Sequence, residues 1–271
     1  MTIYTGQQWI EGEFPGILAI GDSWFWYPNN NILEAISAHP RLKSAYRNMQ
    51  ALGFNGAELD EYVHGKYAAA FQRELRPNNL QYYAAFLISG AGNDAVDYGL
   101  ALKKNCRNRT APEDCMDGER FDRFLKDVSR DMGSLIHDIL WEVAKQNRSV
   151  DIFINGYDYP VPDGRGFGPA PGLTITGPWL KPAMDGARVA PDPQLRQAIC
   201  RLLIDGLDRV FRLFDNSANR VHYISSRGTL SSDPANYQND WANELHPTRA
   251  GFDRIVDRSW IPVLANTGYA T

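Results

Sequence analysis

Residues 17–27 read Ile-Leu-Ala-Ile-Gly-Asp-Ser-Trp-Phe-Trp-Tyr, and this stretch decides the fold. A short apolar run ends abruptly at Gly21, and helix-compatible sequence follows it. Such a run, bounded by a glycine, favours a buried strand over a piece of buried helix. The strand would deliver the hydroxyl group of Ser23 to the end of a sheet. That hydroxyl becomes a nucleophile only with a base to take its proton and donors to hold an oxyanion.

The composition is that of an ordinary globular protein. Of the 271 residues, 44% are hydrophobic and 22% are charged. No linker or charge block divides the chain, so we expect a single domain over residues 1–271. The net charge is −4 and no dense cluster of Lys and Arg is visible, which argues against a nucleic-acid partner.

The sequence shows no targeting or membrane segment. Residues 1–16 lack the basic and apolar regions of a secretory signal. No apolar stretch is long enough to span a bilayer. We therefore expect a cytoplasmic protein, although a trimmed secreted form or export without a signal would leave the same sequence.

Strand-like and helix-like segments alternate along the chain. Strands are expected at residues 16–20, 44–49, 83–89, 150–155 and 220–225, and helices at 31–38, 57–75, 121–146, 193–214 and 248–265. The alternation predicts a three-layer α/β/α sandwich around a flavodoxin-like parallel sheet of about five strands. Two irregular stretches, near 101–118 and 156–189, are expected to form loop insertions over the top of the sheet.

The three cysteines do not have the spacing of a zinc site. Cys106 and Cys115 flank a polar stretch, and we interpret them as reduced thiols rather than as a disulfide that would close a short loop. Cys200 falls within a helical pattern and is expected in the core.

Four polar segments are expected at one edge of the sheet. They comprise residues 21–23, 48–53, 90–94 and 243–248; the first three follow strands and the last precedes the final helix. In a parallel sheet the ligand site lies outside the carboxyl ends of the strands. We therefore expect these segments to meet despite their separation in sequence.

The four segments resemble the four blocks of the SGNH hydrolases, the GDSL-type esterases and lipases. Gly21-Asp22-Ser23 matches the nucleophile turn of that family, and Gly53 matches the glycine after its second strand. Asn93-Asp94 matches its Gly-x-Asn-Asp loop, although Ala91 stands where the family has glycine. His246 matches the histidine of its C-terminal block, so the resemblance covers nearly the whole chain.

The resemblance implies a role for each matched residue. Ser23 attacks an ester carbonyl, and His246 accepts the serine proton and later returns it to the leaving alcohol. The backbone amides of Ser23 and Gly53, with the side-chain amide of Asn93, form the oxyanion hole. This chemistry uses neither a metal nor a cofactor.

The chain departs from the family at the triad acid, because Asn243 stands three residues before His246 where the family has aspartate. Three arrangements are open. The carbonyl of Asn243 orients the imidazole; or a carboxylate from Asp158, Asp240 or Glu244 replaces the missing acid; or a backbone carbonyl does so and leaves a Ser-His dyad.

Aromatic residues near these segments are expected to line a substrate pocket. Trp24 and Trp26 follow the nucleophile, and Trp179 lies in the second insertion. A mainly apolar cleft fits a lipid or short-chain acyl ester, and a sugar ring stacked on an aromatic side chain fits an acetylated carbohydrate. We therefore expect a small-molecule ester as the partner and an acyl-serine intermediate in its cleavage.

Two other functions are compatible with parts of the sequence. A non-catalytic ligand-binding protein on the SGNH scaffold would explain the missing acid as lost catalysis. A flavodoxin-like phosphate or flavin binder would use the turn at Gly21, but it leaves His246 and Asn93 without a role.

Overall fold

The computed structural model describes residues 2–6, 8–28, 30–168 and 174–271. In these residues, six strands form one sheet in the order β1-β3-β2-β4-β5-β6, and every pair of neighbours is parallel. This confirms the expected parallel α/β architecture. The strands are β1 (Ile3–Tyr4), β2 (Ile17–Gly21), β3 (Met49–Gly53), β4 (Ala85–Ser89), β5 (Asp151–Asn155) and β6 (Val221–Ile224).

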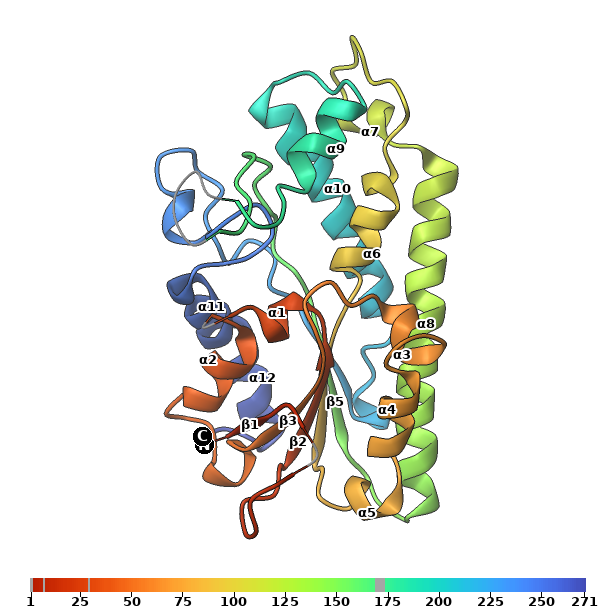
Figure 1. Ribbon diagram of the computed structural model, residues 1–271, viewed down its shortest axis with the longest axis vertical. Coiled ribbons are helices and arrows are strands. Elements are labelled where there is room, and N and C mark those ends of the chain that lie inside the picture. Colours follow the sequence, from red (N-terminus) through yellow and green to blue (C-terminus); the bar gives the residue numbers. More distant parts are fainter. Residues whose placement is uncertain (1, 7, 29, 169–173) are drawn as a thin grey trace.

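Helices cover both faces of the sheet and complete a three-layer sandwich (Figure 1). The central strands β2, β4 and β5 are buried along their whole length, which explains their nearly continuous apolar sequence. On one face lie α2 (Ile32–Ala38), α11 (Arg249–Ile255) and α12 (Ile261–Asn266); on the other lie α3 (Leu59–Val63), α4 (Ala68–Glu74) and α8 (Gly118–Lys145).

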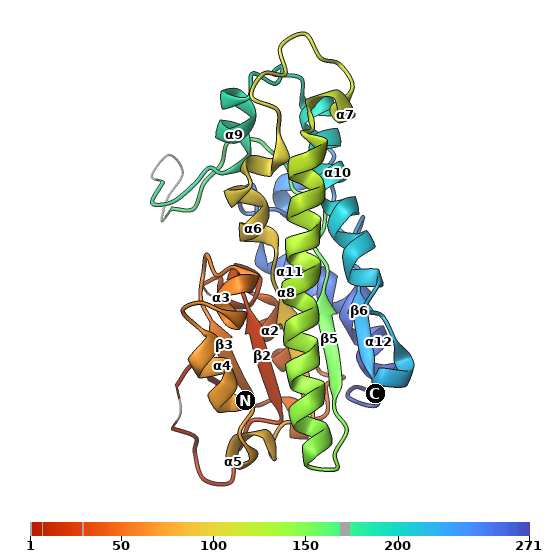
Figure 2. The ribbon, with the colours of Figure 1, turned by 90° about the vertical axis from the view of Figure 1, so that its right-hand side faces the viewer.

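The two longest helices lie close to where the spacing of apolar residues predicts them. They are α8 and α10 (Pro193–Arg212), which pack against each other and run side by side beyond the end of the sheet (Figure 2). Within the helix expected over residues 248–265, a π-helical turn, Val256–Trp260, separates α11 from α12. Within the described residues, no helix is long and apolar enough to cross a membrane.

The strand expected at residues 44–49 is wrong. Residues Ser44–Tyr46 form a 3-10 turn, and the strand itself is β3, which begins at Met49. Gln50 hides the apolar pattern of this strand because it is a polar residue in the core. Its side chain is buried and hydrogen-bonded: Oε1 accepts from the indole N–H of Trp9 at 2.8 Å, and Nε2 donates to the carbonyl of Tyr4 at 3.2 Å. About five strands are expected, and β1 is the additional one. It has only two residues, so the sequence carries no periodic signal for it.

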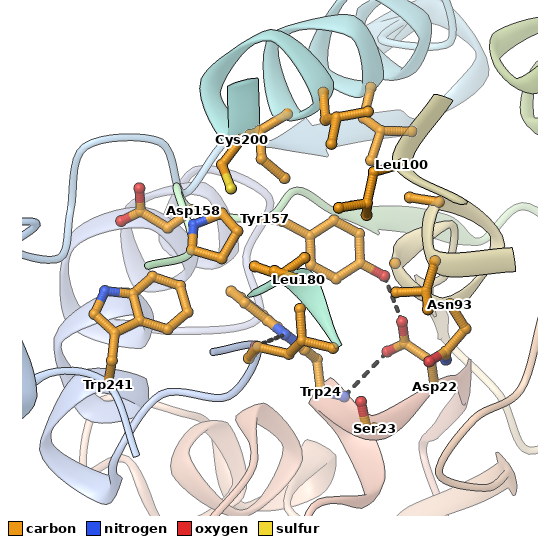
Figure 3. Close-up of a pocket in the computed structure, with 18 residues that line it drawn as sticks. Asp22, Ser23, Trp24, Asn93, Leu100, Tyr157, Asp158, Leu180, Cys200 and Trp241 are labelled. Carbon is orange, nitrogen blue, oxygen red and sulfur yellow. Dashed lines mark hydrogen bonds between the residues drawn. The ribbon is translucent and has the colours of Figure 1, made fainter. Parts of the chain in front are cut away.

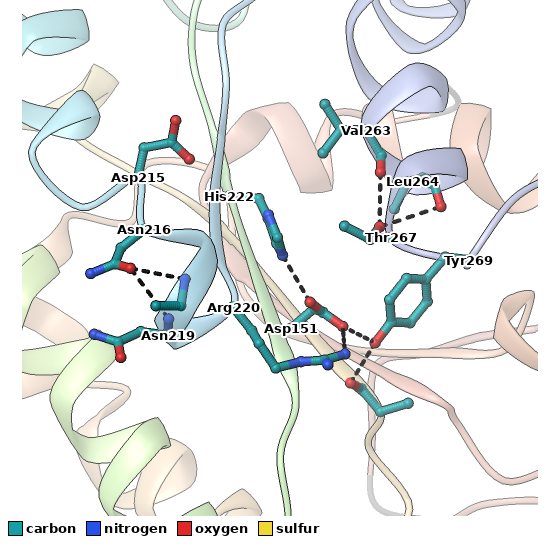
Figure 4. A network of polar contacts seen from close by, with 12 residues as sticks. Asp151, Asp215, Asn216, Asn219, Arg220, His222, Val263, Leu264, Thr267 and Tyr269 are labelled. Carbon is teal, nitrogen blue, oxygen red and sulfur yellow. Dashed lines mark hydrogen bonds and ion pairs between the residues drawn. The ribbon is translucent and has the colours of Figure 1, made fainter.

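Buried polar contacts tie the amino edge of the sheet together (Figure 4). Asp151, the first residue of β5, is buried and pairs with the guanidinium of Arg220. Its carboxylate also lies 2.8 Å from Nε2 of His222 and accepts a hydrogen bond from the hydroxyl of Tyr269 at 2.9 Å. The carboxylate therefore joins β5, β6 and the C-terminal segment at the edge opposite the four polar segments.

The two insertions fold over the carboxyl edge and contain short helices as well as loops. The first contains α7 (Pro112–Cys115) and the second contains α9 (Leu180–Gly186). With the amino-terminal half of α10, they enclose a second apolar core, and we call residues 99–118 and 174–203 the cap. All three cysteines are free thiols buried in this second core. The remaining short helices are α1 (Ser23–Trp26), α5 (Pro77–Leu80) and α6 (Gly92–Asp97).

Gly53 ends β3 in a position that excludes any other residue. It pairs with Gly21 at the end of β2, and its φ angle is 129°. A Cβ atom built on Gly53 would lie 2.0 Å from the hydroxyl of Tyr62 and 2.2 Å from the carbonyl oxygen of Gly21. Both contacts are far below any real Cβ distance, so an alanine would force β2 and β3 apart.

We predict that Gly53→Ala lowers the free energy of unfolding by at least about 3 kcal/mol, from strain in the backbone and displacement of its neighbours. Gly56→Ala is the matched control, because Gly56 also has a positive φ, 85°, but has open space around its Cβ position. Strain alone should cost this variant about 1 kcal/mol. Urea denaturation measures both, and equal losses would contradict the steric argument.

Candidate active site

The turn between β2 and α1 holds Ser23 at the carboxyl edge of the sheet. Asp22 caps α1 by accepting a hydrogen bond from the backbone N–H of Trp24 at 3.0 Å. The hydroxyl oxygen of Ser23 lies 2.7 Å from Nε2 of His246, which comes from the loop before α11. A residue near the start of the chain and one near its end are therefore in hydrogen-bond contact.

The imidazole of His246 is held in one orientation. Its Nδ1 lies 3.0 Å from Oδ1 of Asn243, and its ring stacks on Tyr27 with ring centres 4.2 Å apart. The edge of Trp179 closes another side, with ring centres 5.7 Å apart. Only 5% of the His246 surface is exposed, so neighbouring side chains fix the ring almost completely.

The hydrogen bonds of Asn243 determine which imidazole nitrogen carries the proton. Its Nδ2 donates to the hydroxyl of Tyr27 at 3.1 Å, while Oδ1 accepts from the backbone N–H groups of Leu245 and His246 at 3.0 and 2.9 Å. The oxygen therefore faces Nδ1, which must be the donor. Nε2 then has a free lone pair for the hydroxyl proton of Ser23.

Burial controls the charge of this histidine. Removal from water disfavours the imidazolium and lowers the pKa of His246 to about 3. Asn243 is neutral, so it offers no negative charge that would raise this pKa again. The imidazole is consequently a neutral hydrogen-bond acceptor across the ordinary range of pH.

The segments expected to form an oxyanion hole lie beside Ser23. Gly53 ends β3 next to the strand that leads into Ser23, and Asn93 lies in the first turn of α6, just after β4. The side-chain amide of Asn93 donates one hydrogen bond to the carbonyl of Ala57 at 2.9 Å, which fixes its plane and leaves its second hydrogen available. The role of both residues toward an oxyanion stays a prediction.

An apolar cavity opens beside Ser23 (Figure 3). The empty space between its walls, with the open solvent at its mouth included, is about 620 Å³, and Trp24 forms part of its wall. Trp26 does not line it. This residue is half-buried, and the centre of its ring lies 5.8 Å from that of Phe54. Trp179 is also outside the wall and contacts His246 instead. Of the three tryptophans expected in a substrate pocket, the structure puts one in this cavity.

Comparison with solved structures identifies the fold. A lipase, Lip_vut3, from a goat rumen metagenome matches with a TM-score of 0.52 and 10% identity, over 94% of this chain and 97% of that one. A member of the lipolytic G-D-S-L family from Veillonella parvula has a TM-score of 0.43 and 12% identity, over 89% and 93%. A family 3 carbohydrate esterase from Clostridium thermocellum has a TM-score of 0.46 and 13% identity, over 93% and 97%. The chain has the SGNH hydrolase fold.

At these identities the likeness extends to the fold alone. No protein-family model matches the chain, and no curated protein matches it in sequence. The chemistry of this SGNH fold must therefore be argued from the side chains themselves.

The three carboxylates considered as substitutes for the triad acid bind other groups. Asp158 accepts hydrogen bonds from the backbone N–H groups of residues 159, 228 and 230 at 2.6–2.7 Å. Asp240 pairs with Arg254 and accepts from the backbone N–H of Ser231 at 2.7 Å. Glu244 is occupied by four backbone N–H groups of the second insertion. In this structure Nδ1 of the imidazole faces Asn243.

Sequence reasoning missed a buried polar network behind the nucleophile. The carboxylate of Asp22 accepts hydrogen bonds from the hydroxyl groups of Tyr157 at 2.5 Å and Ser89 at 2.9 Å. Burial raises the pKa of Asp22, and these hydrogen bonds oppose the rise. Ser89 ends β4 and Tyr157 follows β5, so their position at the carboxyl ends of strands is the signal that would have found them.

Glu244 fastens the second insertion to the loop that carries His246. Its side chain is fully buried, and its two oxygens accept from the backbone N–H groups of residues 164, 179, 180 and 181 at 2.7–2.9 Å. The backbone N–H of Glu244 also donates to the carbonyl of Arg165 at 3.2 Å. Through these contacts one carboxylate sets the position of Trp179 against the imidazole.

We predict that Glu244→Gln lowers the free energy of unfolding by about 3 kcal/mol, because the amide NH₂ would face two buried N–H donors and leave them unpaired. Glu113→Gln, at an exposed position in α7, is the control and should change stability by less than about 0.5 kcal/mol. Chemical denaturation measures both. An unchanged stability in Glu244→Gln would show that the four hydrogen bonds are not needed.

Proposed function

We propose that this chain is a serine hydrolase that cleaves carboxylic esters through an acyl-serine intermediate. The observation that carries the proposal is the 2.7 Å contact between the Ser23 hydroxyl and Nε2 of a His246 whose Nδ1 is fixed by Asn243. The solved structure that matches with a TM-score of 0.52 is a lipase, which is consistent with this proposal.

The proposed reaction has two halves. Oγ of Ser23 attacks the ester carbonyl carbon while its proton passes to Nε2 of His246, and the carbonyl oxygen becomes an oxyanion. Donors from Ser23, Gly53 and Asn93 stabilise that oxyanion. The proton then passes to the leaving alcohol as the C–O bond breaks. In the second half a water molecule gives a proton to His246 and attacks the acyl-serine. His246 then returns that proton to Oγ of Ser23 as the acyl–oxygen bond breaks and the acid leaves.

Asn243 gives this mechanism a particular character. Its carbonyl fixes the tautomer of the imidazole, which is one of the two functions of a triad acid. It supplies no negative charge to the imidazolium that forms during attack, which is the other. We therefore propose a Ser-His-Asn site whose base is weak but stays unprotonated in acid.

A fluorophosphonate probe and p-nitrophenyl esters test the proposal directly. Wild-type protein should be labelled on Ser23 and should turn over at least one ester, whereas Ser23→Ala should lose the label and at least about a thousandfold of kcat. Circular dichroism of the variant serves as the folding control. A wild-type protein that neither reacts with the probe nor turns over an ester would favour the alternative of a non-catalytic binding protein.

The pH dependence of kcat/KM tests whether His246 stays unprotonated in mildly acidic solution. With a His246 pKa of about 3, wild-type activity should stay on its plateau as pH falls through 6.5 to about 5. Asn243→Asp should raise this pKa by favouring the imidazolium, so its acidic limb should move up by at least about one pH unit.

Asn243→Ala is the control for that profile. It removes the hydrogen-bond acceptor of the imidazole without adding charge, so the acidic limb should stay at the same low pH as in the wild type. Tryptophan fluorescence at each pH should accompany the assay. Below pH 6.5 the unfolded chain binds a proton that buried His246 refuses, so stability falls as pH falls. An acidic limb near pH 6.5 in folded wild-type protein would contradict the proposed environment of the base.

A further inference from the structure

The cavity beside Ser23 extends from the nucleophile into the cap. Figure 3 shows Ser23 at one end and Cys200 and Leu100 at the other. Four of its wall residues also belong to the second apolar core, so the cap contributes part of the cavity wall. The shared residues are Leu100, Leu180, Cys200 and Leu203.

Apart from Ser23 and Asn93, which act at the reacting carbonyl in the proposed mechanism, the polar side chains of the wall are occupied or point away from the cavity. The carboxylate of Asp22 accepts three hydrogen bonds from protein groups, and that of Asp158 accepts three from backbone N–H groups. The indole N–H of Trp24 donates to the carbonyl of Leu245 at 3.0 Å. The indole N–H of Trp241 has no hydrogen-bond partner among the described residues, but Figure 3 shows it on the side of the ring away from the cavity.

Such a wall suits a hydrocarbon and not a sugar. A sugar ring carries several hydroxyl groups, and each would lose its bonds to water without gaining a partner deep in this cavity. A hydrocarbon chain gains free energy for every methylene group that leaves water. The cavity is therefore chemically selective for an apolar part of the substrate.

The position of the base decides which part of the ester enters. Ser23 and Asn93 line the cavity, whereas His246 is not among the described residues that form its wall. The leaving alcohol has to reach Nε2 of His246 to receive its proton, so it stays outside, beside the imidazole. The acyl chain, attached to the carbon that Ser23 attacks, is the part that points inward.

We propose that this cavity binds the acyl chain, and that the substrates are esters of unbranched acids of medium chain length rather than acetylated carbohydrates. The inference rests on the proposed function and names the substrate class of that site. Cys200 and Leu203 on α10 and Leu180 on α9 then set the longest chain accepted. They are specificity-determining residues contributed by the cap.

Two ester series distinguish the acyl side from the alcohol side. In p-nitrophenyl esters of rising acyl length, kcat/KM should rise about fourfold for each added methylene, or roughly 200-fold from acetyl to hexanoyl, before it levels off. In alkyl acetates of rising alcohol length, kcat/KM should change by less than about fourfold over the same number of methylenes, because that part of the ester stays outside the cavity.

Substitutions at the far end of the cavity give the sharper test. Cys200→Phe should fill that end and lower kcat/KM for the octanoyl ester by at least about 50-fold, while the acetyl ester changes by less than about threefold. Leu202→Phe is the matched control on the same helix, since Leu202 is half-buried and outside the wall. Leu203→Ala should enlarge the cavity and move the acyl length with the highest kcat/KM to longer chains. This variant tests the proposal independently if Cys200→Phe does not fold.

The outcomes separate the two proposals. Ser23-dependent hydrolysis that is fastest for acetyl esters or acetylated sugars would overturn the acyl cavity and leave the proposed hydrolase intact. Length dependence confined to the alkyl acetates would likewise overturn it, because the alcohol would then occupy the cavity. Absence of both fluorophosphonate labelling and hydrolysis across all series would remove the hydrolase and the acyl cavity together.

Discussion

The side-chain amide of Asn243 is the constraint on which the geometry of this site depends. It joins the loop of His246 to Tyr27 at the end of α1, and α1 begins at Ser23. Because Tyr27 also stacks on the imidazole, one ring and one amide fix both the position and the tautomer of His246. Every member of this network is neutral, so its burial avoids the large desolvation cost of a carboxylate with an imidazolium.

The buried carboxylates near the site organise the backbone. Asp22 holds the turn that presents Ser23, Asp158 holds residues 228–230, and Glu244 holds the second insertion. Each is satisfied by several N–H or O–H donors, which is the condition under which burial of a charge is tolerated. Removal of Asp22 or Glu244 would loosen a segment that borders the cavity, and a displacement of about 1 Å at such a site is enough to lower catalysis strongly.

Strong local signals in the sequence predict most of the sheet, and the topology of a parallel sheet together with the resemblance to the SGNH hydrolases predicts the approach of Ser23 to His246. β2 ends sharply at Gly21, and the long helices have a clear apolar period. The sequence misplaces β3 because the buried Gln50 is satisfied by partners 41 and 46 residues away. For a similar reason, the sequence does not determine which group accepts the hydrogen bond from Nδ1 of His246. Asp158 is excluded by bonds to residues 70 and 72 positions later, which no local pattern records.

The cap shows why substrate preference is harder to predict than fold. Its core joins residues of the two insertions with the amino-terminal half of α10. The two insertions have little periodicity, so their apolar side chains look like loop residues in the sequence. Once they pack over the carboxyl edge, they border an apolar space next to the nucleophile, and Trp179 of the second insertion closes one side of the neutral imidazole. Removal from water favours an uncharged base at His246 and an apolar ligand in the cavity by one physical effect, the loss of solvation. The neutral Asn243 beside the imidazole and the apolar wall of the cap therefore both fit a site in which few charged groups are solvated.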